Sequence, residues 1–215
     1  MIGIIDYGMG NVRSVSNALT YLGAEPVVTS DPAVLDECDR LILPGVGAFG
    51  DAMSQLRSRG LIPILERQAL ERAKPMLGIC LGMQLLARLS YEHGEHQGLG
   101  WFDGEVVRFD GERGIKVPHM GWNTVTLRRP HPLFAGLSAE HLDFYFVHSF
   151  HVTCKDPRDV LATTIHGDEV TVAIGRGNVV GVQFHPEKSQ DNGMHVLAAF
   201  ASWVPDEALA GVAAP

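Results

Sequence analysis

The sequence predicts an α/β fold, a single three-layer domain with a mostly parallel central sheet. Short apolar runs alternate with amphipathic stretches through the first half of the chain, as they do where crossover helices join parallel strands. Residues 98–183 instead carry several short β-like runs separated by turn residues, so the second half is richer in strands. With 215 residues, 46% of them hydrophobic and 20% charged, the chain is long enough for one sizeable domain and short for two.

Local patterns predict the elements of the first half and one helix near the end of the chain. Apolar residues at positions 15, 18, 19 and 22 recur at helical spacing, and Gly23 ends that helix. Asp31 and Pro32 mark the start of a second helix, because Pro is favoured at the first helical position. Apolar residues at positions 197, 200, 201 and 204 predict a closing helix. The predicted strands of this half are residues 2–5, 26–29, 40–43 and 75–79.

The chain shows no internal repeat, linker or domain boundary. Residues 1–204 are therefore predicted to form one domain, and residues 205–215, which contain Ala, Gly and Pro, are expected to fray.

Composition and charge argue against several classes of partner. The net charge is −8 and no Lys/Arg cluster is present, which argues against nucleic acid or an anionic membrane surface. No apolar run approaches the ~20 residues of a membrane span, and no basic leader precedes the first strand. Three scattered cysteines suit a reducing compartment, so we expect a cytoplasmic protein. The ten histidines include no dedicated ligand pair, and neither a metal nor a cofactor is predicted.

Residues 78–84 carry the most informative motif, Gly-Ile-Cys-Leu-Gly-Met-Gln, directly after an apolar run. A Gly-x-nucleophile-x-Gly sequence between a buried strand and a helix is the pattern of a nucleophile elbow. The turn would set Cys80 at a helix N-terminus, where free N–H groups and the helix dipole favour the thiolate. A buried cysteine in a tight turn fits the motif equally well when the motif is taken alone. By contrast, Cys38 lies among acidic residues and is expected to be inert, as is Cys154 in a strand-like run.

A candidate base lies near the C-terminus in the sequence His-Pro-Glu at residues 185–187. Pro186 favours an extended His185, and residues i and i+2 of an extended chain project to the same side. His185 and Glu187 can therefore meet, which would orient the imidazole as a base for a thiol nucleophile. When His-Pro-Glu is taken alone, a surface turn is favoured over a catalytic base. Two complementary motifs at the carboxyl ends of buried strands are much stronger together, because ligand sites of open α/β sheets lie there.

These two motifs together resemble the class I glutamine amidotransferases, whose catalytic triad is Cys, His and Glu. The matching positions are Cys80, His185 and Glu187. Further segments resemble the glutaminase-subunit family of imidazole glycerol phosphate synthases, enzymes of histidine biosynthesis, over residues 2–203. They are Asp-Tyr-Gly-Met-Gly-Asn at 6–11, Leu-Pro-Gly-Val-Gly-Ala-Phe-Gly at 43–50, Pro-His-Met-Gly-Trp-Asn at 118–123 and Tyr-Phe-Val-His-Ser-Phe at 145–150.

The resemblance implies a flavodoxin-like amidotransferase fold, L-glutamine as substrate, and a (β/α)8-barrel cyclase subunit as partner in a heterodimer. It implies hydrolysis of glutamine to glutamate and ammonia, and passage of the ammonia to the cyclase, which makes imidazole glycerol phosphate and AICAR. The oxyanion donors implied are the N–H groups of Val46 and Leu81, and Gly45 and Gly47 would let the Val46 segment adopt two backbone states. The implied glutamine-binding residues are Gly47, Gln84, Glu92, His148 and Ser149, and the implied interface residues are Asn11, Trp122 and Lys188.

Two alternatives stay open at this point. The first is another enzyme of the same superfamily, such as the glutaminase partner of pyridoxal phosphate synthase or a γ-glutamyl hydrolase; Pro-His-Met-Gly-Trp-Asn favours the imidazole glycerol phosphate branch. The second is a catalytically silent domain that acts only as a binding module, which the intact triad disfavours. The competing structural interpretation of Glu92 is a solvated surface residue. That of Trp122 is a core residue.

Overall fold

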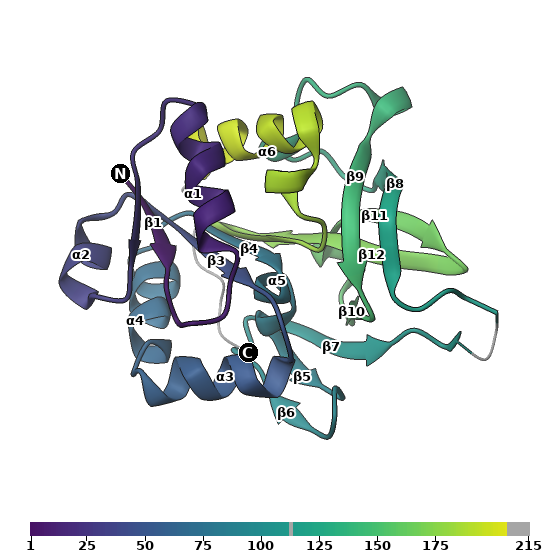
Figure 1. Ribbon diagram of the computed structural model, residues 1–215, viewed down its shortest axis with the longest axis horizontal. Helices are drawn as coiled ribbons and strands as arrows, with labels where there is room; N and C mark the ends of the chain where they lie inside the picture. The colour runs from purple at the N-terminus through teal and green to yellow at the C-terminus, as the bar shows by residue number, and fades with distance from the viewer. Residues whose placement is uncertain (112–113, 206–215) are drawn as a thin grey trace.

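The computed structural model describes residues 1–111 and 114–205, which form two sheets with helices packed against them (Figure 1). The nine strands of the large sheet are, in chain order, β1 (Ile2–Ile5), β2 (Pro26–Thr29), β3 (Arg40–Gly45), β4 (Met76–Cys80), β8 (His119–Leu127), β9 (Asp143–His148), β11 (Val160–His166), β12 (Asp168–Arg176) and β13 (Val179–Val182). The four strands of the small sheet are β5 (Ala87–Ser90), β6 (His96–Gln97), β7 (Phe102–Arg108) and β10 (Phe150–Cys154). The helices are α1 (Val12–Tyr21), α2 (Pro32–Glu37), α3 (Phe49–Ser58), α4 (Ile62–Glu66), α5 (Leu81–Leu85) and α6 (Gln190–Ser202), with a π-helical turn (Arg67–Glu71) after α4.

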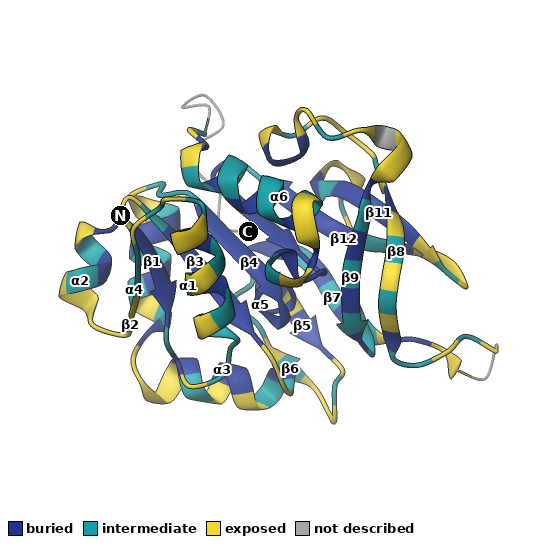
Figure 2. Ribbon diagram, turned by 45° about the horizontal axis from the view of Figure 1, so that its top comes forward, coloured by how far each residue is buried: buried dark blue, intermediate teal, exposed yellow. Residues whose placement is uncertain are grey.

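The large sheet is parallel in one half and antiparallel in the other. Its strand order is β2-β1-β3-β4-β13-β12-β11-β8-β9. The pairs from β2 through β13 are parallel, and those from β13 through β9 are antiparallel. The strands β1 and β4 are buried along their whole length (Figure 2), and so is β13, as the continuous apolar runs predict for a sheet covered on both faces.

Two hydrophobic clusters, one on each face of this sheet, make the domain three-layered. On one face α1 and α6 bury residues such as Leu19 and Phe200. On the other, α2 to α5 and the small sheet bury residues such as Leu35, Leu56 and Phe102. The three-layer α/β fold predicted from the sequence is confirmed.

Most element boundaries match the predictions closely, and one does not. The strands at 2–5 and 26–29 are found as predicted, and Asp31 caps α2 by accepting a hydrogen bond from the Ala33 N–H at 2.9 Å. The closing helix α6 ends at Ser202, so Val204, which helical spacing placed within it, lies outside. Val204 precedes Pro205, and a residue before proline is disfavoured in the α conformation. The frayed tail expected at 205–215 lies, from residue 206 on, outside the described residues.

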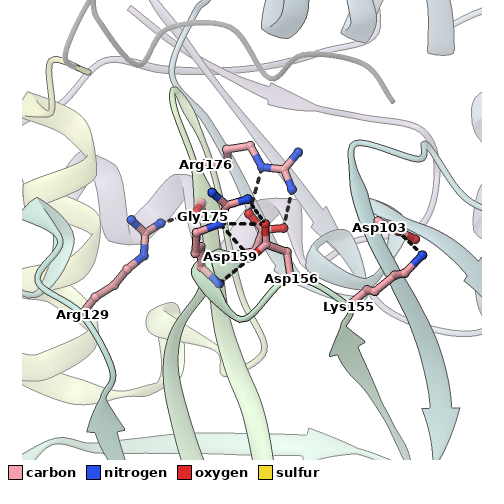
Figure 3. Close-up of polar contacts among 8 residues, drawn as sticks. Asp103, Arg129, Lys155, Asp156, Asp159, Gly175 and Arg176 are labelled. Atoms are coloured by element: carbon pink, nitrogen blue, oxygen red, sulfur yellow. Dashed lines mark hydrogen bonds and ion pairs between the residues drawn. The ribbon is translucent and has the colours of Figure 1, made fainter.

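A group of ion pairs joins the end of β12 to the turn before β11 (Figure 3). Asp159, whose side chain is 3% exposed, accepts a hydrogen bond from Arg176 Nε at 2.8 Å and pairs with Nη2 of the same guanidinium. Arg129 donates to the backbone carbonyl of Gly175 beside them. This group ties down the hairpin that flanks β13. Among the described residues, no helix is long and apolar enough to cross a membrane.

Candidate active site

The candidate nucleophile, Cys80, lies at a strained turn between β4 and α5. Cys80 has φ 55° and ψ −112°, a conformation that non-glycine residues rarely adopt and that recurs at functional sites. The glycine two residues later allows the turn to pack against the neighbouring strand, because a Cβ on Gly82 would lie 1.8 Å from the carbonyl oxygen of Leu43. The predicted nucleophile elbow is therefore present in the fold. Since α5 has only five residues, its free N–H groups matter more at this site than a long helix dipole.

The candidate base, His185, lies just beyond the end of the neighbouring strand β13. Strand β13 pairs in parallel with β4, with Val182 opposite Ile79, so the residues that follow both strands lie at the same edge of the sheet. His185 Nδ1 is 2.9 Å from Glu187 Oε1, and both side chains are buried. The contact predicted from His-Pro-Glu is thus found, although Pro186–Lys188 form a 3-10 turn rather than an extended chain.

The electrostatics favour a protonated His185. Burial alone would lower the pKa of His185, but its interactions with Cys80 and Glu187 outweigh burial and raise that pKa to about 9. Burial would raise the pKa of Glu187, and the hydrogen bond from His185 lowers it instead. A thiolate paired with an imidazolium is the state in which a cysteine nucleophile is ready to react.

Several polar residues that the sequence interpretation missed support this pair. Gln183 is fully buried and donates from Nε2 toward Cys80 Sγ at 3.8 Å. Ser189 donates to the His185 carbonyl oxygen at 2.6 Å and accepts from the Tyr145 N–H at 3.0 Å, which ties the turn after His185 to β9. The signal for Gln183 was available, because it precedes His185 by two residues and an extended chain there would place both side chains on the same side.

Asn11 and Tyr7 lie beside the predicted triad on the segment after β1. Asn11, predicted at a partner interface, donates from Nδ2 to Glu187 Oε1 at 3.1 Å and so orients the predicted third member of the triad. Tyr7 is fully buried, and its hydroxyl has no hydrogen-bond partner among the described residues. Burial, with a smaller contribution from the charge of Cys80, raises the pKa of Tyr7.

A cleft of about 370 Å³ opens over Cys80, within the ~300–1,000 Å³ range of small-molecule sites. It brings together every predicted catalytic, oxyanion and substrate-binding residue except Glu187, which lies behind His185. The cleft is lined by Val46, Gly47, Cys80, Leu81, Gln84, Glu92, Pro118, Val147, His148, Ser149, Phe150, His185 and Lys188. A larger hollow of about 660 Å³ lies elsewhere, around residues 127–135, and its lining offers no nucleophile.

The hydrogen bonds of two cleft residues define what each can do. Gln84 donates from Nε2 to the Phe150 carbonyl oxygen at 2.9 Å and to Gln183 Oε1 at 3.0 Å, so its amide nitrogen is engaged with protein groups. Glu92 accepts from the Phe49 N–H at the start of α3 at 2.6 Å, which holds its carboxylate at the rim of the cleft.

An exposed cluster of Trp122, Tyr145 and Lys188, here called the Trp122 surface, lies next to the cleft. Trp122 is 49% exposed and packs edge-on against Tyr145, with ring centroids 6.2 Å apart. Lys188 Nζ lies 5.9 Å from the centroid of the Tyr145 ring, within cation–π distance. Trp122 is therefore not a core residue.

The other two cysteines are poor nucleophiles. Burial raises the pKa of the Cys38 thiol, which donates to the Val34 carbonyl oxygen, and it raises the pKa of Cys154 to about 12. The thiols expected to be inert thus lie in settings that disfavour the thiolate.

Comparison with known proteins shows the family to which this chain belongs. The family model for class-I glutamine amidotransferases matches residues 3–202. Imidazole glycerol phosphate synthase subunit HisH of Sulfurimonas denitrificans is 52% identical over 206 residues, covering 94% of this chain and 98% of that protein. The HisH subunit of Syntrophotalea carbinolica is 50% identical and covers 93% of this chain and 98% of its own length.

Solved structures agree at the level of the fold. PurLQS from Thermotoga maritima gives a TM-score of 0.72 at 22% identity, with 93% of this chain and 96% of that chain covered. The chain therefore belongs to the class-I glutamine amidotransferases, enzymes that hydrolyse glutamine, and within them to the HisH subunits of imidazole glycerol phosphate synthase.

Proposed function

We propose that Cys80, His185 and Glu187 are the triad with which this chain hydrolyses L-glutamine to glutamate and ammonia. The observation that carries the proposal is the strained Cys80, held in one cleft with a His185 whose pKa is raised to about 9. A lone buried cysteine needs neither the positive φ nor a partnered imidazole.

The reaction runs in two stages. The Cys80 thiolate attacks the side-chain amide carbon of glutamine, and His185 protonates the departing nitrogen, which leaves as ammonia with a γ-glutamyl thioester on sulfur. His185 then takes a proton from water, the hydroxide attacks the thioester, and glutamate and the thiolate are released. Glu187, held by Asn11, keeps the imidazole oriented and stabilises its cationic form.

The tetrahedral intermediates need donors for their oxyanion. The Leu81 N–H, at the start of α5, and the Val46 N–H, on the loop after β3, are assigned this role because both residues line the cleft beside Cys80. The glutamine α-amino group is assigned to Glu92 and the α-carboxylate to the backbone at His148 and Ser149, with Gly47 and Gln84 completing the pocket.

The partner is assigned as a (β/α)8-barrel cyclase that receives the ammonia and makes imidazole glycerol phosphate and AICAR in histidine biosynthesis. The relatives' names, which call each of them a synthase subunit, support a complex. The exposed Trp122 surface beside the cleft supports its location, because an aromatic anchor and a cation next to the triad suit a docking face. A closed interface keeps ammonia from protonation and loss in water.

The partner is also assigned a switching role. Gly47 has φ 101°, so the Val46 segment lies between residues that tolerate alternative backbone states. If Val46 N–H points to the oxyanion only in the complex, the lone subunit lacks one donor and is slower by roughly 10²–10³-fold. The cyclase must bind the active state more tightly to shift the balance.

Ammonia release from glutamine, measured with and without the cyclase, tests the chemistry. Cys80→Ser is expected to lose turnover, whereas Cys154→Ser, the matched control, is expected to keep it. Normal turnover by Cys80→Ser would overturn the triad assignment. No ammonia release by the wild-type complex would favour a silent binding module, and full turnover by the lone subunit would refute the switch alone.

Co-purification with the cyclase, and the glutamine-dependent reaction on its ribulosyl nucleotide substrate, test the docking face. Trp122→Ala and Lys188→Ala are expected to weaken the complex and to uncouple the two reactions. Tyr21→Ala, at an exposed position at the end of α1, is the matched control. Unchanged assembly and coupling in the first two variants would show that the interface lies elsewhere.

A further inference from the structure

A chain of hydrogen bonds runs from β8 into the wall of the cleft. His119 and His148 face each other across the β8–β9 pair, with Nδ1 of His119 2.9 Å from Nε2 of His148. Nδ1 of His148 lies 2.8 Å from the carbonyl oxygen of Phe150. At the other end, Asn123 Nδ2 lies 3.0 Å from Nε2 of His119.

The groups at both ends determine the direction of every bond. The Phe150 carbonyl can only accept, so His148 carries its proton on Nδ1 and its Nε2 must accept. His119 therefore donates from Nδ1, and its Nε2 accepts from Asn123. The Asn123 amide is itself oriented, because its Nδ2 donates to the Ile165 carbonyl at 2.9 Å and its Oδ1 accepts from the Thr124 N–H at 2.9 Å.

Both rings are neutral in this arrangement. Burial, with smaller contributions from the neighbouring histidines, lowers the pKa of His148 to about 3 and that of His119 to about 4. A neutral His148 offers no positive charge to a ligand, so it contributes to the cleft through the fixed position of its ring. It is 6% exposed, and a buried ring nitrogen that loses its partner is costly.

At the Phe150 end, this chain of hydrogen bonds joins the hydrogen bonds that Gln84 and Gln183 make beside Cys80. The Phe150 carbonyl accepts from His148 and also from Gln84, which donates to Gln183 beside Cys80. The corner between β9 and β10 is thus held from two sides, and residues 147–150 of this corner line the cleft.

We infer that Asn123 and His119 are positioning residues for glutamine binding, because their one-way chain of hydrogen bonds holds His148 in its Nδ1–H form and fixes the β9–β10 corner of the cleft. The inference rests on the proposed function, since that corner is where the glutamine α-carboxylate is assigned. It adds two residues that do not line the cleft.

Two substitutions of His119 separate its donor from its ring. His119→Asn places an amide nitrogen where Nδ1 was and keeps the donor to His148, but it loses the ring that stacks on Phe146 and His166 at 4.6 Å and 4.1 Å. His119→Phe keeps a stacking ring and loses the donor. The measurement is KM and kcat for glutamine hydrolysis by the full chain with its cyclase.

His119→Phe is expected to raise KM about tenfold, which corresponds to about 1.4 kcal/mol, and to leave kcat within about twofold because the triad is untouched. His119→Asn is expected to keep KM within about twofold of the wild type. Thr126→Ala, on the exposed face of β8, is the matched control and should change neither constant. Wild-type KM in His119→Phe, or an equal rise in His119→Asn, would overturn the inference.

A second measurement does not depend on activity or on the folding of a variant. The ¹⁵N chemical shifts of the imidazole nitrogens in the wild-type chain should show His148 and His119 neutral at pH 7, each protonated on Nδ1. A proton on Nε2 of either ring would overturn the inference even in an active enzyme. Failure of the wild-type complex to hydrolyse glutamine, by contrast, would refute the proposed function and leave this tautomer result standing.

Discussion

Replacing Cys80 by alanine and by glycine measures the strain stored at the nucleophile. Both variants lose the thiol and differ only by a methyl group at φ 55°, ψ −112°. At an ordinary buried site the change from alanine to glycine costs about 1.5 kcal/mol, from the lost methyl burial and the greater chain entropy of glycine. A non-glycine residue in a disfavoured backbone conformation destabilises the fold by about 1–3 kcal/mol, and glycine avoids this strain.

Ala173 supplies the reference, because it is fully buried in β12 and does not have a positive φ. We expect Ala173→Gly to lower the free energy of unfolding by about 1.5 kcal/mol. Going from Cys80→Ala to Cys80→Gly should change the free energy of unfolding more favourably than Ala173→Gly does, by about 1–3 kcal/mol. At position 80 the change from alanine to glycine is therefore expected to be nearly neutral or stabilising. Urea unfolding followed by tryptophan fluorescence gives both differences. If the two alanine-to-glycine steps agree within about 0.5 kcal/mol, the turn stores no strain.

Three further predictions concern stability. The pKa of His185 is raised from 6.5 to about 9, so the stability that protonated His185 contributes to the fold is complete below pH 6.5 and is lost as the pH rises to 9. The urea midpoint of the wild type should therefore fall more between these pH values than that of Glu187→Gln. Equal falls in the two proteins would contradict the pairing of His185 with Glu187. Asp159→Asn should cost about 2–3 kcal/mol in the same assay, less than a fully buried pair because Arg176 is 35% exposed, and a loss below about 1 kcal/mol would show that the pair is solvated. Tyr7→Phe should leave the thermal midpoint unchanged or higher, since the hydroxyl has no partner among the described residues; a clear drop would reveal a bridging water.

The parallel half of the sheet could be predicted because each strand is a short apolar run bounded by turn residues. The antiparallel half could not be ordered in the same way. Strands β8, β9, β11 and β12 have similar local patterns, and only long-range pairing decides their neighbours. Val204 shows the same limit at a helix end, where apolar spacing continued past the point at which Pro205 prevents a helix.

For the site, the chemistry proposed for Cys80 and His185 was predictable from motifs, whereas their proximity was expected only from the family resemblance and not from any local pattern. It depends on β13 pairing with β4, which no local pattern indicates. Gln183 was overlooked because it is a single polar residue in an apolar run, and such a residue forms no pattern that indicates a role. Asn11 was assigned to an interface by resemblance, and the structure shows that it also donates a hydrogen bond to Glu187 of the proposed triad.

The position of β13 between β4 and β12 has a consequence for how the molecule comes into being. During synthesis, β4 and its cysteine leave the ribosome first, and the strand that carries the base is among the last parts made. Until β13 enters the gap, the sheet is unfinished at its centre and Cys80 lacks its neighbour His185, the proposed base. On the proposed mechanism, a chain that ends before β13 is therefore expected not to hydrolyse glutamine.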